Sequence, residues 1–458
     1  MIFSSVFFLW IFLPTVIALY YISSLMFKND PENQIKANNV LLLIASLVFY
    51  GLGGYRYLFL LLAVLFINFF GGKIAGKGKR AAMIITVIAD IGMLSVFKFA
   101  DTFTEIILPL GISFYIFQSV SYVVDVYQKK TDIQNDFIKF SLYVSFFPQL
   151  VAGPIVKYTD IEKQLTDRRS STDRFFDGMI RFSMGMAKKV LIANTLAGPV
   201  DAIFNGQIKG LGASVTWFGA ICYILQLYYD FSGYSDMAIG LAKIFGFELK
   251  ENFDHPYSSC SIKEFWRRWH ISLSNWFKEY VYIPLGGSRC ANGRIVMNLL
   301  IVFALTGIWH GAKLTFVTWG LFNGILIISE RLFTGKLLKK NPVKMINRLY
   351  TLCMVTLGFA VFRSQNIWQA LSYLKEMFSK GSGTYTIFSY ISMRVMIALV
   401  IGMIIAFPVY NTIQKKFKSA GYKAVWENVT AIMALVLMAL SMAEIIAGSY
   451  HPFLYFQF

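Results

Sequence analysis

The four histidines of this sequence, His255, His270, His310 and His451, are the side chains best suited to move protons near neutral pH. His310 stands in the string Gly-Ile-Trp-His-Gly, inside a stretch whose composition is typical of a membrane helix. An ionisable residue at membrane depth is costly, which makes it a functional-site hypothesis by default. His310 could therefore act as a general base, and the glycines on either side would let another molecule approach it. The residues alone leave one alternative open, a histidine that only bonds a backbone carbonyl.

A second cluster of candidate residues lies between residues 252 and 276 and contains His270. At helical spacing its tryptophans form an aromatic face, and its arginines form a basic one. This pattern is typical of an interfacial helix with an aromatic belt, but arginine also pairs bidentately with phosphate, so the cluster could bind a phosphorylated donor. His270 could be catalytic or could be a structural histidine beside its arginines. The residues assigned to donor binding are Trp266, Arg267, Arg268, Trp269 and Asn275.

A third polar group interrupts an apolar helix between residues 226 and 237. Two carboxylates there are expensive at the end of such a helix unless they are paired. They either form a satisfied polar network around a helix break at Gly233, line a polar tunnel, or relay protons in a transporter. The residues assigned to the tunnel are Gln226, Asp230, Ser232, Tyr234, Ser235, Asp236 and Trp309.

The carboxyl-terminal string Phe-Leu-Tyr-Phe-Gln-Phe, residues 453–458, is either an aromatic membrane anchor or a segment that presents the Tyr455 phenol to an active site. His451 nearby is expected to be a surface histidine. The four cysteines show no CxxC spacing, so nothing indicates a disulfide or a zinc site, and no metal site is predicted.

These residues must be positioned by membrane helices, because 56% of the 458 residues are hydrophobic and only 15% are charged. Soluble proteins carry about 25% charged residues. The sequence predicts an all-α, polytopic membrane protein, and an amino-terminal segment without a cleavage site is expected to remain as a first helix. The expected spans are 3–26, 38–55, 57–72, 82–99, 111–127, 138–153, 178–198, 214–229, 295–310, 314–333, 348–364, 391–410 and 427–447.

The net charge of +18 is concentrated in short loops, which indicates membrane topology and argues against nucleic acid binding. Three basic loops placed in the cytoplasm put both termini outside, and the parity of crossings then favours ten to twelve spans. Residues 155–180 and 250–294 are too polar to span and are expected to be amphipathic segments at the cytoplasmic interface. We therefore expect a single domain over residues 1–458, with an external tail at 448–458.

Six strings of this chain together resemble the membrane-bound O-acyltransferase family, in its bacterial branch that O-acetylates alginate and peptidoglycan. They are residues 109–115, 147–154, 230–238, 265–274, 282–287 and 309–311. The resemblance implies a ring of tilted and re-entrant helices around a central tunnel. It implies that His310 is the catalytic histidine and that His270 is a second histidine of the site. It also implies that Tyr455 carries the acyl group.

The resemblance further implies a bacterial inner-membrane enzyme that moves an acetyl group from a cytoplasmic thioester to an extracytoplasmic polysaccharide. The donor would be acetyl-CoA, with no permanently bound cofactor. The partner would be an extracytoplasmic transferase similar to SGNH hydrolases. Three alternatives remain: D-alanyl transfer to teichoic acid by the same fold, a non-enzymatic polysaccharide transporter, and a eukaryotic-type lipid or protein acyltransferase. The external tail tyrosine and the need for an external partner argue against the last.

Overall fold

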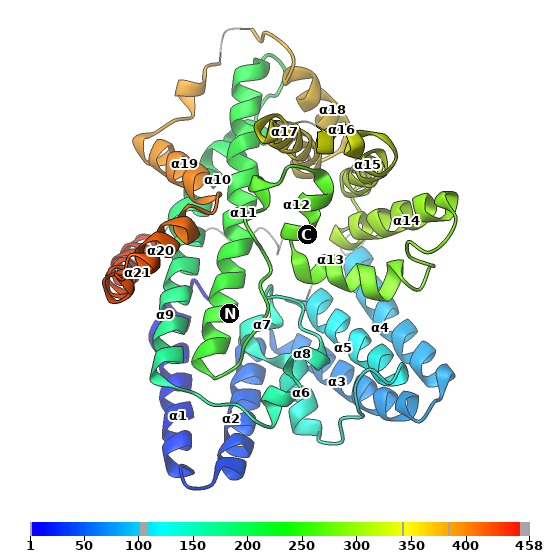
Figure 1. Cartoon of the computed structure of the whole chain (residues 1–458), viewed down its shortest axis with the longest axis vertical. Coiled ribbons are helices and arrows are strands. Elements are labelled where there is room, and N and C mark those ends of the chain that lie inside the picture. The colour runs from blue at the N-terminus through cyan, green and yellow to red at the C-terminus, as the bar shows by residue number, and fades with distance from the viewer. Residues whose placement is uncertain (1, 101–108, 341–342, 383–384, 449–458) are drawn as a thin grey trace. The chain divides into compact units, whose positions relative to one another are not determined.

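The computed structural model describes residues 2–100, 109–340, 343–382 and 385–448, and within these ranges the chain is helical, with no strand (Figure 1). This confirms the all-α prediction. The described residues divide into two compact units, and the division passes through α9, α11 and α21. The prediction of a single domain stays a prediction.

Among the described residues, the first unit comprises those within Met1–Met186, Tyr234–Glu251 and Ile445–Gly448. Its helices begin at positions that the sequence marks; for example, the Asp30 side chain accepts a hydrogen bond from the Asn33 N–H and so caps the second helix. The elements are η1 (Phe8–Phe12), α1 (Leu13–Met26), α2 (Pro31–Gly51), α3 (Tyr55–Gly76), α4 (Arg80–Ala100), α5 (Ile112–Tyr127), α6 (Phe137–Ser145), α7 (Phe147–Leu150), α8 (Tyr158–Ile161), η2 (Lys163–Leu165) and α9 (Thr172–Ala187).

The second unit comprises Ala187–Gly233 and Asn252–Glu444 among the described residues, and it carries both candidate catalytic histidines that the structure describes. Its elements are η3 (Lys188–Ala193), α10 (Asn194–Phe204), α11 (Gly212–Ile244), η4 (Pro256–Ser258), α12 (Ile262–Arg268), α13 (Ile271–Phe277), η5 (Lys278–Tyr282), α14 (Asn292–His310), α15 (Leu314–Ser329), η6 (Glu330–Thr334), α16 (Gly335–Lys340), α17 (Lys344–Arg363), α18 (Ile367–Glu376), η7 (Ile387–Ser389), α19 (Met393–Ile405), α20 (Val409–Ser419) and α21 (Lys423–Ile446).

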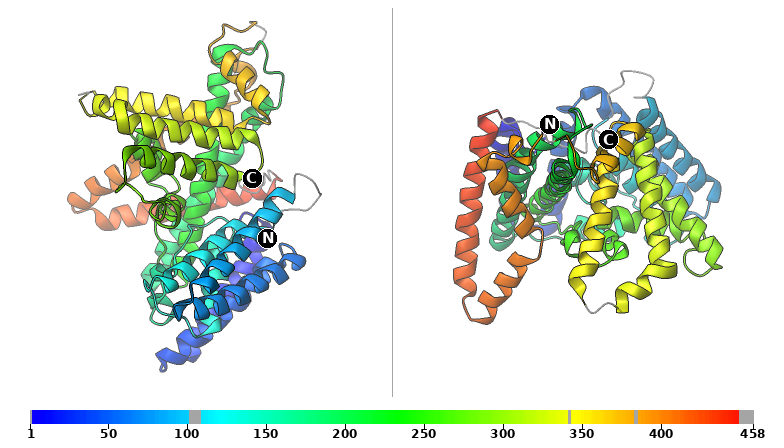
Figure 2. Two further views of the ribbon diagram at one scale, coloured as in Figure 1. Left: turned by 90° about the vertical axis from the view of Figure 1, so that its right-hand side faces the viewer. Right: turned by 90° about the horizontal axis from the view of Figure 1, so that it is seen from above.

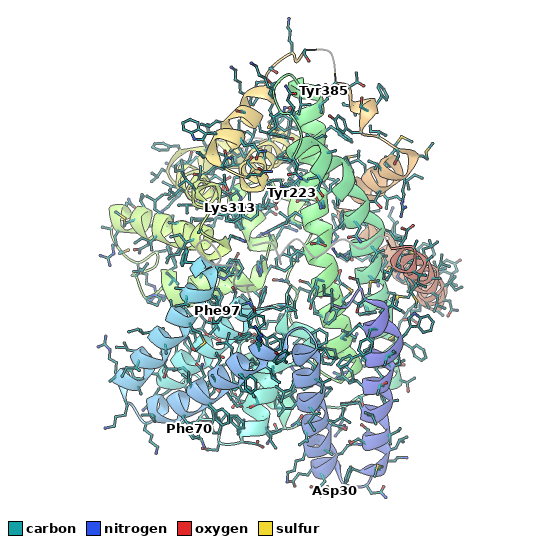
Figure 3. All side chains as sticks on the ribbon, turned by 180° about the vertical axis from the view of Figure 1, so that it is seen from behind. Asp30, Phe70, Phe97, Tyr223, Lys313 and Tyr385 are labelled. Atoms are coloured by element: carbon teal, nitrogen blue, oxygen red, sulfur yellow. The ribbon has the colours of Figure 1, made fainter. Side chains whose placement is uncertain are left out.

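Eight helices in the described part of the chain are long and apolar enough to cross a membrane, which defines a multi-pass membrane protein. Side chains such as Phe70, which is 53% exposed, point away from the helices where lipid would cover them (Figure 3). The eight helices are Phe8–Met26, Pro31–Gly51, Tyr55–Gly76, Arg80–Phe99, Asn292–His310, Leu314–Leu338, Lys344–Arg363 and Lys423–Ile446. A ninth segment, Met393–Ile405 with Val409–Phe417, is also long and apolar enough to cross a membrane but is bent by 62°.

The expected count of ten to twelve crossings is not reached by straight apolar helices among the described residues. The predicted span 138–153 breaks into α6 and the four-residue α7, because Pro148 cannot continue a helix that precedes it. The predicted span 178–198 is divided among α9, the π-helix η3 and α10. Helix α5 has only 16 residues, whereas a span needs about 20.

Helices α14 and α15 are drawn in yellow-green in Figure 2, and the distances at their glycines show that their backbones touch. A Cβ atom at Gly307 would lie 2.5 Å from the Phe316 carbonyl oxygen, and one at Gly320 would overlap the Phe303 carbonyl oxygen. Small residues at such a crossing let membrane helices pack through their backbones. The expectation that Gly307 leaves room for another molecule is therefore wrong, because α15 fills that room.

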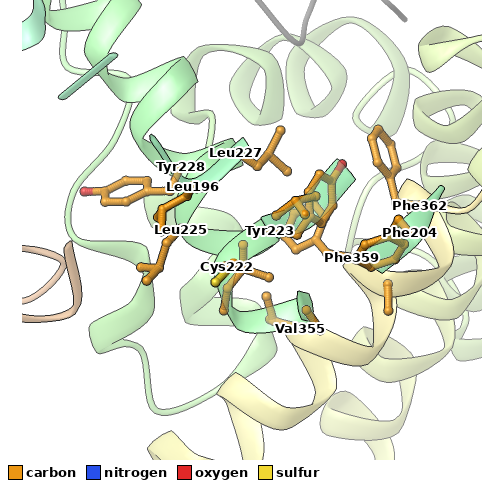
Figure 4. Packing of buried hydrophobic residues seen from close by; sticks show 14 of the residues in the cluster. Leu196, Phe204, Cys222, Tyr223, Leu225, Leu227, Tyr228, Val355, Phe359 and Phe362 are labelled. Atoms are coloured by element: carbon orange, nitrogen blue, oxygen red, sulfur yellow. The ribbon is translucent and has the colours of Figure 1, made fainter. Parts of the chain in front are cut away.

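The core of the second unit is a cluster of buried aromatic and aliphatic side chains from α10, α11 and α17 (Figure 4). Tyr223 of α11 and Phe359 of α17 lie in it, and Phe204 of α10 stacks on Tyr373 with ring centroids 4.2 Å apart. Phe362 belongs to the same cluster and also contacts His310. The core therefore extends to the wall of the candidate site.

Candidate active site

His310 is the last residue of α14 and is buried, with 9% of its surface exposed. The helix ends there because Gly311 adopts a φ of 145°, a backbone conformation that glycine reaches without strain. The Gly311 N–H donates to the Ile308 carbonyl and closes the last turn. The imidazole is thus fixed at a helix end and does not project from the middle of a helix.

Aromatic rings from three helices enclose the His310 imidazole. Trp319 of α15 and Phe362 of α17 meet it edge-on, with centroids 5.3 Å and 5.0 Å away at 85° and 90°. Phe316 lies 6.2 Å away, and the neighbouring Trp309 lies 4.7 Å away. Edge-to-face packing of this kind is favourable and restricts the plane of the ring. The enclosure holds the imidazole in one orientation.

His270 lies between α12 and α13 and is buried, with 2% exposed. Its backbone is left-handed, with φ 43° and ψ 57°, which is uncommon for a residue with a side chain. The imidazole packs edge-on against Phe231 of α11 at 4.6 Å. Its Nδ1 lies 3.2 Å from the Asn252 side-chain oxygen. Burial lowers the pKa of His270 to about 3, so its imidazole is neutral at physiological pH.

Trp309 lies against both histidines. Its ring centroid is 6.3 Å from that of His270 and 4.7 Å from that of His310. The two imidazoles, 40 positions apart in the sequence, therefore contact the same indole. The structure thus brings together His270, Trp309 and His310, all of which the sequence singled out.

The predicted donor-binding residues separate into a buried part and an exposed part. Trp269 is 5% exposed and belongs to the aromatic core, and the Trp266 indole N–H donates to the Asn323 side-chain oxygen at 3.2 Å. The Arg268 guanidinium forms ion pairs with Glu264 at 2.9 Å and Asp254 at 3.2 Å.

Two predicted donor-binding residues remain accessible to a ligand. The Arg267 side chain is 75% exposed and reaches Glu264 only at 4.0 Å, and Asn275 is exposed. The two tryptophans pack inside the fold, so a soluble anion would meet the arginine and asparagine side chains first.

The carboxylates of α11 are paired with cations. In the second unit, Asp230 lies 2.5 Å from the Lys189 ammonium of η3, and both side chains are buried. Gln226 and Ser232 are buried on the same helix. In the first unit, the Arg181 guanidinium binds Asp236 at 2.9 Å and also pairs with Glu251.

The predicted break at Gly233 is wrong. Helix α11 runs without interruption for 33 residues, and its two carboxylates pair with cations from η3 and α9. Tyr234 and Ser235 are buried within it, and Tyr234 stacks on Phe3 with centroids 4.7 Å apart. The pairing of the two carboxylates fits the satisfied network that the sequence left open as one alternative.

Tyr455 and His451 lie outside the described residues. Among the described residues, no group of three or more His, Cys, Asp or Glu side chains could hold a metal ion. Two residues that the sequence did not single out, Lys189 and Phe362, belong to these contacts. A lysine in the predicted apolar span 178–198 was a signal for the first, and no local signal marked the second.

The described residues thus form a polytopic helical membrane protein in which two buried imidazoles contact one indole. Residues 135–373 match the family model described as the membrane-bound O-acyltransferase family. The chain belongs to this family, in its bacterial O-acetyltransferase branch, and is an acyltransferase.

Three relatives illustrate the similarity. A "probable alginate O-acetylase" of Pseudomonas aeruginosa is 40% identical, over 83% of this chain and 76% of the relative. A protein of the same name from Pseudomonas putida is 36% identical over 100% of both chains. A "peptidoglycan O-acetyltransferase" of Helicobacter pylori is 34% identical, over 82% of this chain and 80% of the relative.

Proposed function

We propose that this protein transfers an acetyl group from a cytoplasmic thioester across the membrane for O-acetylation of an extracytoplasmic polysaccharide. The observation that carries the proposal is the contact of His270 and His310 with Trp309 inside an aromatic enclosure. The names of the relatives, which act on alginate or peptidoglycan, support a polysaccharide as the final acceptor. Alginate, peptidoglycan or another exopolysaccharide would each fit this proposal.

The chemistry requires a base for a hydroxyl group and a site that excludes water. The hydroxyl oxygen attacks the thioester carbonyl carbon, and the His310 imidazole takes the hydroxyl proton. The carbon–sulfur bond then breaks, and the leaving thiolate takes the proton from the His310 imidazolium. A positioned base of this kind contributes about 10²–10⁴-fold to the rate. The aromatic rings around His310 keep its orientation fixed and limit hydrolysis of the thioester.

The donor side of the proposal is acetyl-CoA, with no resident cofactor. The Arg267 side chain is more accessible than that of Arg268, and a guanidinium pairs well with phosphate. Arg268 would have to exchange its carboxylate partners to do the same, so we assign Arg267 the larger role. Trp266, Trp269 and Asn275 would shape the region beside it.

On the acceptor side, the proposal has both termini outside the bacterial inner membrane. Tyr455 in the external tail would receive the acetyl group on its phenol oxygen, with His310 as the base. An extracytoplasmic transferase similar to SGNH hydrolases would then pass the group to the polysaccharide. The buried polar residues of α11 would line the route between the two sides.

The experiment compares the O-acetyl content of envelope glycans by mass spectrometry in cells with three variants. His310→Ala should abolish acetylation while the protein stays in the membrane, and Tyr455→Phe, which removes one oxygen, should strongly reduce it. His255→Asn, which removes a histidine outside the Trp309 contacts, is the matched control and should keep acetylation. Wild-type acetylation in His310→Ala would overturn the proposed base.

A second assay separates the proposal from D-alanyl transfer and from transport. Purified protein should consume acetyl-CoA and should not consume a D-alanyl thioester of a carrier protein. A His310→Ala variant that still moves glycan across the membrane would instead favour a transporter.

A further inference from the structure

The side chain of Asn252 connects the segment before α12 to His270 and to Ser272 at the start of α13. Its oxygen Oδ1 accepts a hydrogen bond from the Ser272 backbone N–H at 3.2 Å and from the Ser272 hydroxyl at 2.9 Å. The same oxygen lies 3.2 Å from His270 Nδ1. One amide oxygen therefore faces three nitrogen or oxygen atoms of the chain that begins α13.

This arrangement selects one tautomer of His270. A backbone N–H can only donate, so the Asn252 atom that faces the Ser272 N–H has to be the oxygen. An oxygen of this kind can only accept, so His270 Nδ1 has to carry the hydrogen. A neutral imidazole has one N–H, and the other ring nitrogen, Nε2, then holds a lone pair.

The surroundings keep this geometry rigid. The Ile271 N–H donates to the Asn252 carbonyl at 2.9 Å, and the Asp254 N–H donates to the Arg268 carbonyl at 3.0 Å. Asn252 is 1% exposed and His270 is 2% exposed, so water does not compete for these bonds. A left-handed residue such as His270 persists only where its neighbours over-determine its conformation.

The nitrogen on the other side of the ring has no such partner. His270 Nε2 is buried without a hydrogen-bond partner among the described residues. A buried acceptor without a partner costs free energy, and such atoms mark sites where a ligand or water completes the bonding. The ring that carries this nitrogen lies against Trp309, which also contacts His310.

We infer that Asn252 is a positioning residue that holds His270 as the Nδ1–H tautomer, so that Nε2 accepts a hydrogen bond from an N–H or O–H group of the acyl acceptor other than the hydroxyl that gives its proton to His310. The ligand of this nitrogen is thus a neutral N–H or O–H donor. The tautomer follows from the contacts alone, and the identity of the ligand rests on the proposed function.

The first test measures the tautomer without any substrate. The chain has four histidines, so protein labelled with ¹⁵N-histidine gives four imidazoles, and His270→Asn identifies the signals of His270. We expect Nδ1–H in the wild type and in Asn252→Asp, and a mixture of tautomers in Asn252→Ala. An Nε2–H tautomer in the wild type, or an unchanged tautomer in Asn252→Ala, would overturn the inference. The wild-type spectrum keeps the test valid if Asn252→Ala does not fold.

The second test measures acetyl transfer by the same purified variants. Asn252→Ala should lower kcat by about 10- to 100-fold with little change in KM for the thioester, as when a partner that orients a functional histidine is lost. Asn252→Asp should restore most of kcat, but its carboxylate raises the pKa of His270 and should move the acid limb of the rate profile to higher pH. An Asn252→Ala enzyme with wild-type kcat would contradict the role of Asn252. A wild type that transfers no acetyl group would refute the proposed function and leave the tautomer assignment standing.

Discussion

The Lys189–Asp230 pair offers a direct test of what holds η3 against α11. The ammonium lies 2.5 Å from the carboxylate, and the two side chains are only 5% and 2% exposed. Removing one partner of such a buried pair leaves an uncompensated charge and costs about 3–5 kcal/mol of stability. Removing both charges with residues of similar volume costs much less. Asp230→Asn should therefore be more destabilising alone than together with Lys189→Met.

The assay is a double-mutant cycle on detergent-purified protein, with the apparent Tm measured as loss of the monodisperse peak. The matched control is Glu32→Gln, which makes the same carboxylate-to-amide change in the exposed pair with Lys36 and should leave the Tm almost unchanged. Equal losses in Asp230→Asn and in the double variant would show that the pair does not couple and would refute the reasoning. Retained acetyl transfer in the double variant would argue against a proton relay through Asp230.

Two further changes test the surroundings of the histidines. Gly320→Ala places a Cβ atom closer than 3.0 Å to the Phe303 carbonyl oxygen, so overpacking should cost about 1–3 kcal/mol of stability and lower the activity. The control is Gly293→Ala, whose Cβ atom meets nothing within 4 Å and which should be tolerated. Equal Tm values for the two variants would contradict the close helix contact. His270 has a pKa of about 3 in the folded protein against 6.5 as its usual value, so the unfolded chain binds the extra proton between these pH values and stability should fall with decreasing pH. The loss should approach about 1.4 kcal/mol per pH unit below 6.5, and the Tm difference between pH 7.5 and pH 5.5 should be smaller in His270→Asn; parallel pH profiles would contradict the buried neutral imidazole.

The apolar spans could be predicted from the sequence because hydrophobicity and length are local properties. The prediction 295–310 corresponds to α14, and 427–447 corresponds to α21. The prediction was wrong where the continuation of a helix depends on partners that are distant in the sequence. Helix α11 continues through Gly233 because Lys189 and Arg181, more than 40 positions away, satisfy its carboxylates.

The site was predictable in its residue types and less so in its contacts. His270 and His310 were marked by their rarity in an apolar chain, and Trp309 by its place beside His310. The Asn252 side chain lay in a string that drew attention, but its bond to His270 depends on a left-handed turn that no local pattern indicates. Arg268 was predicted to bind an anion from outside, and its ion pairs with Glu264 and Asp254 depend on how the chain folds back.

The direct backbone contact between α14 and α15 restricts the movement of one helix relative to the other. With Gly307 against one carbonyl oxygen and Gly320 against another, sliding either helix along its neighbour would drive an oxygen into a Cα hydrogen. His310 and Trp319 therefore travel together as one block. Phe362 of α17 packs against both His310 and Trp319, so a movement of α17 would change the wall of the site on a third side.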